Sequence, residues 1–200
     1  YRRVHLEGFL RLLTLARQRR VAHVTYTSAL GVRLDAGAAY AETKARAEGA
    51  LERSGLTGTV VAPSIIFGPG SEIVATLDLL SRLPVVPVPG IDAPFRPIHV
   101  DDAATLVAEA ITGDDPPRRI DLSGPEELTF FEVARAYLEP RGCRTVVVPF
   151  ALSRLALSLL SRVKIPGAPA ELGAMLSIDN AGSPPEHGRE LVRFSDWARG

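Results

Sequence analysis

The sequence predicts an α/β fold built on a parallel sheet that helices cover on both faces. Apolar residues make up 46% of the chain and charged residues 23%, the balance of a globular protein with a substantial core. Two runs rich in β-branched residues, at 21–27 and 57–62, flank an alanine-rich stretch at 39–51. A strand, a crossover helix and a second strand in this order are typical of a parallel sheet.

The first helix and the first strand are predicted from periodicity. Between residues 4 and 17, apolar side chains such as Phe9 and Leu13 recur at helical spacing, and most arginines fall outside that stripe. The strand at 21–27 follows. Small residues and glycines then fill 28–38, as expected of a loop at the carboxyl end of a buried strand.

The second helix and the second strand complete this part of the sheet. The helix at 39–51 places Tyr40 and Lys44 on one face. Gly55 marks its exit, and the strand at 57–62 follows.

Beyond residue 63 the pattern changes to shorter elements after a loop rich in proline and glycine. The sequence predicts helices at 73–83, 103–111, 130–138, 152–163 and 189–199, strands at 85–88, 119–122 and 144–148, and an irregular stretch at 94–97. Asp101 is expected to cap the helix at 103–111, and His99 is expected to act structurally beside it. Thr129 and Glu132 are expected to form a capping box for the helix at 130–138.

Composition excludes several classes of protein. The 23 basic and 23 acidic residues balance and form no long run, so the chain lacks the charge footprint of a nucleic-acid-binding protein. No stretch reaches the roughly 18 apolar residues that a membrane-spanning helix requires. Cys143 is the only cysteine, so no intrachain disulfide can form, and we predict a cytoplasmic protein. Tyr1 stands where the middle of a domain is expected, which predicts a fragment of a longer protein.

Tyr40 and Lys44 are the residues best suited to chemistry, because they lie one helical turn apart. A phenol has a pKa near ~10, and a nearby positive charge favours phenolate, so Lys44 would bring Tyr40 towards the range of a useful acid or base. The same spacing is common on ordinary exposed helices, and both interpretations stand at this point. Ser28 would add a hydroxyl at the end of the preceding strand, facing the same crevice.

Five segments in order carry a resemblance to a known superfamily. They are Val4-His5-Leu6-Glu7-Gly8, Val24-Thr25-Tyr26-Thr27-Ser28, Tyr40-Ala41-Glu42-Thr43-Lys44, Ala62-Pro63-Ser64-Ile65-Ile66-Phe67-Gly68-Pro69-Gly70 and Pro97-Ile98-His99-Val100-Asp101-Asp102-Ala103-Ala104. Together they resemble the extended and atypical short-chain dehydrogenase/reductases. That superfamily includes nucleotide-sugar epimerases, flavonoid reductases and the Rossmann-fold accessory subunit of respiratory complex I.

The resemblance implies the C-terminal part of a Rossmann-type parallel sheet plus a small α/β substrate domain. Residues 1–68 would form the C-terminal half of the NAD(P)-binding domain, and 69–200 a mixed substrate-binding region in which 95–125 returns to the Rossmann sheet. The family's glycine-rich turn, which binds the cofactor pyrophosphate, would lie upstream of residue 1. Gly68-Pro69-Gly70 cannot replace it, because Pro69 lacks an N–H donor and the segment follows the wrong strand.

The resemblance also implies roles for individual residues. Tyr40 would exchange a proton with the substrate carbonyl or hydroxyl, Lys44 would bind the nicotinamide ribose and lower the pKa of Tyr40, and Ser28 would orient the substrate oxygen. The residues expected to line the nicotinamide pocket of bound NAD or NADP are Pro63, Ser64, Ile65 and Ile66. No metal site is expected. A homodimer would form through the helices at 4–17 and 39–51.

Three positions depart from the family pattern. The family usually carries its active hydroxyl at the second of two adjacent positions, which here are Ser28 and Ala29. Ala62 replaces a common arginine, and Phe95 stands where sugar-nucleotide epimerases carry an arginine for the diphosphate. The first hypothesis is therefore an NAD(P)-dependent oxidoreductase or epimerase-like enzyme acting on a small carbonyl or hydroxyl compound. The second is a non-catalytic dinucleotide-binding or scaffold protein of the complex I accessory-subunit type.

Overall fold

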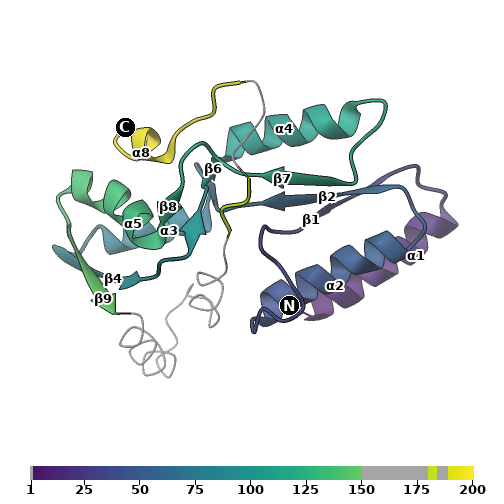
Figure 1. Cartoon of the computed structure of the whole chain (residues 1–200), viewed down its shortest axis with the longest axis horizontal. Coiled ribbons are helices and arrows are strands. Elements are labelled where there is room, and N and C mark those ends of the chain that lie inside the picture. Colours follow the sequence, from purple (N-terminus) through teal and green to yellow (C-terminus); the bar gives the residue numbers. More distant parts are fainter. Residues whose placement is uncertain (1, 150–179, 184–188) are drawn as a thin grey trace.

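The computed structural model describes residues 2–149, 180–183 and 189–200 (Figure 1). Its central element is a three-stranded parallel sheet in the order β1 (Val24–Thr27), β2 (Gly58–Pro63) and β7 (Arg119–Leu122). Because the strands are parallel, their carboxyl ends meet at one edge of the sheet. The parallel sheet confirms the predicted α/β class.

Helices cover both faces of this sheet. A π-helix η1 (Arg2–Gly8), α1 (Phe9–Gln18) and α2 (Ala39–Arg53) lie on one face, and α4 (Val100–Thr112) lies on the other (Figure 1). Successive side chains of a strand point to opposite faces, and β2 follows this rule. Val60 packs with the α1 and α2 side, and Val61 packs with the α4 side.

A second core lies beside the sheet and is built from short elements. They are β3 (Ile66–Phe67), α3 (Glu72–Leu80), β4 (Val85–Gly90), β5 (Pro94–Phe95), β6 (Ile98–His99), β8 (Leu128–Thr129), α5 (Phe130–Leu138), η2 (Glu139–Arg141) and β9 (Arg144–Pro149). The strands β4 and β9 pair in parallel. Phe67, Leu77, Val86 and Leu138 are almost completely buried between them and the helices, so this part has its own apolar centre.

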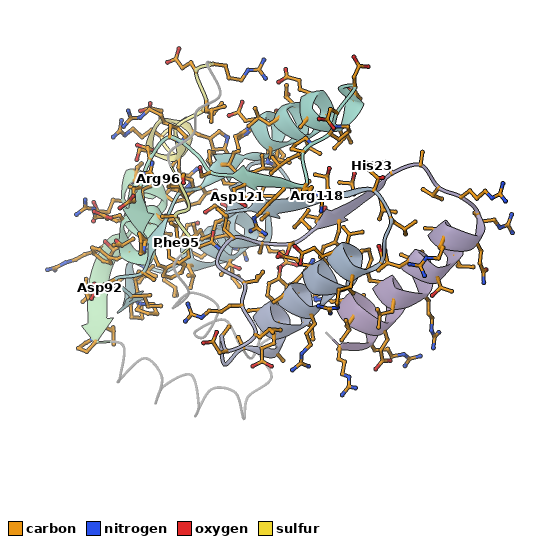
Figure 2. The ribbon with its side chains drawn as sticks, turned by 45° about the vertical axis from the view of Figure 1, so that its right-hand side comes forward. His23, Asp92, Phe95, Arg96, Arg118 and Asp121 are labelled. Carbon is orange, nitrogen blue, oxygen red and sulfur yellow. The ribbon has the colours of Figure 1, made fainter. Side chains whose placement is uncertain are left out.

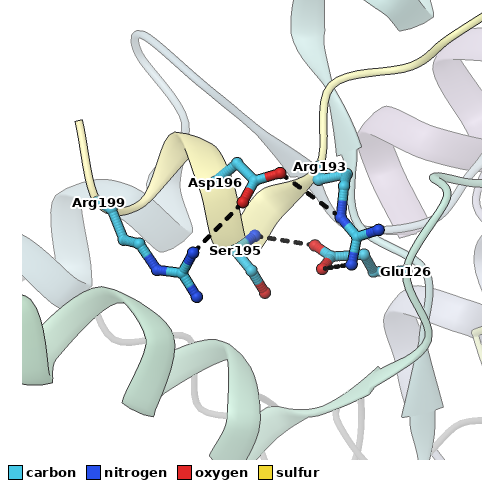
Figure 3. A network of polar contacts seen from close by, with 5 residues as sticks. All are labelled: Glu126, Arg193, Ser195, Asp196 and Arg199. Atoms are coloured by element: carbon cyan, nitrogen blue, oxygen red, sulfur yellow. Dashed lines mark hydrogen bonds and ion pairs between the residues drawn. The ribbon is translucent and has the colours of Figure 1, made fainter.

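The C-terminal helix α8 (Phe194–Trp197) is held against the loop that precedes β8 (Figure 3). The buried carboxylate of Glu126 accepts a hydrogen bond from Arg193 Nη2 at 2.9 Å and another from the Ser195 backbone N–H at 2.8 Å. Phe194 is 1% exposed, so it anchors the helix to the core. The helix is shorter than the one predicted at 189–199, because residues 189–193 are not helical. The expected helix at 152–163 lies outside the described residues.

Several element boundaries are confirmed, and one cap is wrong. The strand at 119–122, the helix at 130–138 and the capping box of Thr129 with Glu132 are present as predicted. Asp101 does not cap α4. Instead His99 Nδ1 accepts from the backbone N–H of Asp101 at 3.3 Å, so the helix begins earlier, at Val100. Within the described ranges, none of the helices has the length and apolar character needed to cross a membrane.

Candidate active site

Tyr40 and Lys44 lie in the first turns of α2, directly after the loop that leaves β1. The Lys44 ammonium donates a hydrogen bond to the backbone carbonyl of Thr27, with 2.7 Å between Nζ and O. Thr27 is the last residue of β1 and immediately precedes Ser28. The start of α2 is therefore tied to the carboxyl end of the sheet, where parallel α/β sheets bind ligands.

Two tyrosine rings flank the Lys44 ammonium. Nζ lies 5.1 Å from the ring centroid of Tyr26 and 5.8 Å from that of Tyr40, both within the range of a cation–π contact. Burial lowers the pKa of the Lys44 ammonium below its usual value, while the Glu48 carboxylate opposes that shift. The arrangement places a partly desolvated positive charge beside the Tyr40 phenol, which favours the phenolate form.

Ser28 brings a buried hydroxyl to the same edge. Its backbone N–H donates to the Val61 carbonyl at 2.7 Å, which extends the sheet by one residue, and the side chain is 3% exposed. Among the residues that the structure describes, no group bonds its Oγ. A buried hydroxyl without a partner costs free energy, so its retention at a strand end is typical of a functional position or a water site. Ala29, the next residue, is half-buried and has no hydroxyl.

Sequence reasoning did not foresee His5 as a neighbour of Tyr40. The two rings meet edge to face with 5.4 Å between centroids, because η1 packs along the start of α2. Burial and the charge of Lys44 lower the pKa of the His5 imidazole. The signal in the sequence was its place in the first resembling segment, but the contact itself depends on tertiary packing.

The segment Pro63 to Ile66 joins the site mainly through its backbone. The Leu30 N–H donates to the Pro63 carbonyl at 2.9 Å, which brings the Ser28 loop beside the end of β2. The Ser64 hydroxyl donates to the Asn180 carbonyl at 2.8 Å and accepts from the Arg96 N–H at 3.2 Å. The side chain of Ser64 therefore serves the scaffold. Its backbone N–H donates to the Leu122 carbonyl at 2.8 Å, and Ile65 packs against the cluster of Ile91 and Phe95.

Asn180 is a second residue that sequence reasoning missed. Its Nδ2 donates to the Leu30 carbonyl at 3.0 Å and its backbone N–H donates to the Pro94 carbonyl at 3.1 Å. Together with Ser64 it ties three loops at the carboxyl end of the sheet. Asn180 lies 116 residues from Ser64 in the sequence, so no local pattern could have indicated the contact.

Phe95 and Arg96 do not form a diphosphate site. The Phe95 ring is 1% exposed and packs against Ile91, and the Arg96 guanidinium pairs with Glu127 at 2.8 Å. Both lie on the side of the molecule away from His23 at the start of the sheet (Figure 2). Phe95, which replaces the arginine of the sugar-nucleotide epimerases, therefore serves to pack the core. This argues against a sugar diphosphate bound there.

Within residues 2–149, 180–183 and 189–200, the groups at this edge fit the nicotinamide end of a dinucleotide but not its pyrophosphate end. A Cβ at Gly68 would lie 2.9 Å from Val100 Cγ1 and 3.0 Å from His99 Nε2, so close packing accounts for this glycine. Gly70 has φ +81°, which accounts for it as a turn residue. In contrast, the buried Ser28 hydroxyl and the desolvated Lys44 ammonium offer polar groups suited to ribose hydroxyls and a substrate oxygen.

One cavity on the described surface lies apart from these residues. A cavity of about 540 Å³ lies between the Gly68–Ser71 loop, Asp78, Tyr137 and Trp197, and is lined by none of Tyr40, Lys44 and Ser28. Two of its polar side chains bond each other, since Tyr137 Oη donates to Asp78 at 2.5 Å. Over the described parts of the chain, no cluster of three or more histidine, cysteine or acidic residues is placed to hold a metal ion.

Comparisons with known proteins agree with the fold. No protein-family model matches the sequence, and no curated protein matches it. A nucleoside-diphosphate-sugar epimerase from Staphylococcus aureus superposes with a TM-score of 0.76 at 18% identity, over 96% of this chain and 70% of that one. An NADPH complex of a quinone oxidoreductase from Escherichia coli superposes with a TM-score of 0.75 at 15% identity. The match covers 95% of this chain and 69% of that one.

A dTDP-glucose 4,6-dehydratase from Streptomyces venezuelae, solved with NAD, gives a TM-score of 0.62 at 21% identity, over 74% of this chain and 54% of that one. The chain thus spans between 54% and 70% of the length of these three proteins. It has the Rossmann-type fold of NAD(P)-dependent epimerases, dehydratases and reductases, as the sequence predicted.

Proposed function

We propose that this chain, which has the fold of NAD(P)-dependent epimerases and reductases, is the catalytic part of an oxidoreductase or epimerase-like enzyme acting on a small carbonyl or hydroxyl compound. The observation that carries the proposal is the position of Lys44. Its ammonium is bonded to the Thr27 carbonyl and partly desolvated between Tyr26 and Tyr40. Burial of an ammonium costs free energy. A lysine without a functional role would therefore keep its charged end in solvent rather than at the end of a strand.

Each of the three catalytic residues has a distinct role. When a carbonyl is reduced, the Tyr40 Oη–H donates its proton to the substrate oxygen as the carbonyl carbon becomes tetrahedral, and in oxidation the phenolate takes that proton back. The Lys44 ammonium keeps its proton and stabilises the phenolate by charge. Ser28 Oγ–H donates a hydrogen bond to the substrate oxygen and so holds it within reach of Tyr40.

The cofactor contact involves the same residues. NAD or NADP, when bound, supplies or accepts the hydride. Lys44 and Tyr40 would hold the nicotinamide ribose, and the backbone of Pro63 and Ser64 with the side chains of Ile65 and Ile66 would line the ring. The similar structures solved with NADPH and with NAD support a nicotinamide dinucleotide of either kind.

The second candidate is a non-catalytic dinucleotide-binding protein, and one observation favours it. Ala29 occupies the position where the family's active hydroxyl is expected, and Ser28 is 3% exposed. A hydroxyl so deeply buried would reach a substrate only if the loop moved. In that case Lys44 and Tyr40 would bind the cofactor without proton transfer.

Replacement of Tyr40 by phenylalanine distinguishes the two candidates. Turnover of the full-length protein on a panel of aldehydes, ketones and secondary alcohols should fall by roughly 10² to 10⁴, the contribution of a general acid. The dissociation constant for NAD(P)H should change far less than turnover, because Lys44 still holds the ribose when the Tyr40 hydroxyl is removed. The matched control is Tyr137→Phe, which removes a phenol hydroxyl from the remote cavity and should leave turnover unchanged. Turnover that survives Tyr40→Phe would refute the catalytic role, and cofactor binding without any turnover would favour the second candidate.

A further inference from the structure

Tyr26 is the second described neighbour of the Lys44 ammonium in β1, beside the Thr27 carbonyl. Tyr26 lies in β1, two residues before Ser28. Both side chains are buried, whereas those of Thr25 and Thr27, which alternate with them along the strand, are exposed. This alternation puts Tyr26 and Ser28 on the same face of the strand. That face is the one on which α2 packs.

The Tyr26 ring has a fixed orientation. It is 8% exposed and packs against Phe9, with 4.3 Å between ring centroids and a tilt of 36°. Ala47 and Leu51 of α2 belong to the same buried cluster. The ring is therefore held by α1 on one side and α2 on the other, and it presents its face to the Lys44 ammonium at 5.1 Å.

Its hydroxyl takes no visible part in this arrangement. In the described part of the chain Tyr26 Oη is buried without a hydrogen-bond partner. Burial, followed by the neighbouring Tyr40 and Glu48, raises the pKa of Tyr26 to about 12. Tyr26 thus stays neutral at physiological pH, and it offers Lys44 an aromatic face rather than an acid or base.

We propose that Tyr26 is a positioning residue, whose ring holds the Lys44 ammonium against the Thr27 carbonyl and beside Tyr40. A lysine side chain has many rotamers, and one hydrogen bond leaves the ammonium free to swing about its acceptor. The aromatic face removes that freedom through a cation–π contact in a partly desolvated setting. The proposal rests on the proposed function for its catalytic meaning, but the geometry can be tested without any substrate.

The test is a titration of the Tyr40 phenol by NMR in full-length protein that carries ¹³Cζ-tyrosine, with Tyr40→Phe to assign its resonance. Tyr26→Leu should raise the pKa of Tyr40 by about half a unit, because the mean distance of the Lys44 charge increases. Tyr26→Phe, which keeps the ring, should titrate like the wild type. In a Lys44→Met background, Tyr26→Leu should add no further shift, because the charge it positions is gone.

If Tyr26→Leu fails to fold, Tyr26→Met takes its place, since methionine adapts to irregular cavities without offering an aromatic face. An unchanged Tyr40 titration in the folded aliphatic variant would overturn the proposal, as would an equal shift in Tyr26→Phe. Where the enzyme turns over, kcat should fall by about tenfold in Tyr26→Leu and recover in Tyr26→Phe, with little change in KM. Absence of turnover in the wild type would count against the proposed function alone, because the phenol titration still reports the position of Lys44.

Discussion

At the scale of the residue, the candidate site gathers three titratable side chains around one ammonium. The ring centroid of Tyr40 lies 5.8 Å from Lys44 Nζ and that of Tyr26 lies 5.1 Å from it. The ring of His5 packs edge to face on that of Tyr40. Burial shifts the pKa values of His5, Tyr26 and Lys44, and the charge of Lys44 lowers that of His5 further. The protonation of one should therefore be measurable through the others.

His5 makes the stability of the protein depend on pH. Burial, and then the charge of Lys44, lowers the pKa of His5 in the folded state, whereas the unfolded chain keeps the usual value near ~6.5. The unfolded state then binds more protons as the pH falls through this range, so the contribution of His5 to stability is fully present above about pH 6.5 and is lost at lower pH. The free energy of unfolding in urea should be lower at pH 5.5 than at pH 7.5, and His5→Gln should reduce that difference. An unchanged difference in His5→Gln would show that other groups cause it.

The chemical pair at this scale could be predicted from the sequence, but its neighbours could not. Tyr40 and Lys44 are one turn apart on a helix, so their proximity follows from spacing alone. Tyr26 could have been found by counting two residues back from Ser28 along the strand. His5 and Asn180 reach the site through helix packing and through a contact of 116 residues in sequence, which no local pattern encodes.

At the scale of the element, the helix at 130–138 and the strand at 119–122 were predicted correctly, whereas the helix predicted at 189–199 is confined to 194–197. The helix at 130–138 and its capping box are present because Thr129 and Glu132 satisfy each other's backbone donors locally. The paired strands β3 with β6 and β5 with β8 have two residues each, too few for any periodicity. The start of α4 was misplaced because a histidine is an uncommon N-cap, and Asp101 was the stronger candidate by residue type.

The attachment of α8 depends on Glu126, which joins segments 67 residues apart (Figure 3). Glu126→Ala should lower the free energy of unfolding by about 1–3 kcal/mol, because it leaves the Ser195 N–H and Arg193 without their acceptor. The matched control is Asp196→Ala, whose exposed contacts with arginines should be worth about 0.5 kcal/mol or less. The fluorescence of Trp197, the only tryptophan of the chain, follows unfolding in urea and so measures the loss of stability in each variant. Equal effects in the two variants would contradict the role of Glu126.

At the scale of the whole molecule, the family resemblance implies that the chain is divided into part of a cofactor domain and a substrate region. We propose that residues 1–68 with 95–125 form half of a cofactor domain and that the rest of 69–200 forms the substrate region. Support comes from β7, which joins β2 in the main sheet after the smaller elements intervene. A parallel crossover of this length has no signature in local sequence, so only the resemblance could suggest it.

We also propose a homodimer through η1 and α1 with α2. The proposal rests on the resemblance, since family members often pair through these two helices. An interface there would cover Val4, Leu12 and Leu15, which are exposed by 72%, 61% and 51%. Sedimentation of the full-length protein at micromolar concentration tests this: a monomer would refute it.

Lys44 and Tyr40 are proposed to bind and use a nicotinamide dinucleotide. The measurement that tests it most directly is the binding of NADH and NADPH to full-length wild type and Lys44→Met, followed by nicotinamide fluorescence. The wild type should bind at least one of the two cofactors, and Lys44→Met should weaken that binding by about tenfold or more, since a charge-assisted hydrogen bond to the ribose is lost. Binding of neither cofactor by the wild type, or equal affinity in Lys44→Met, would contradict the account.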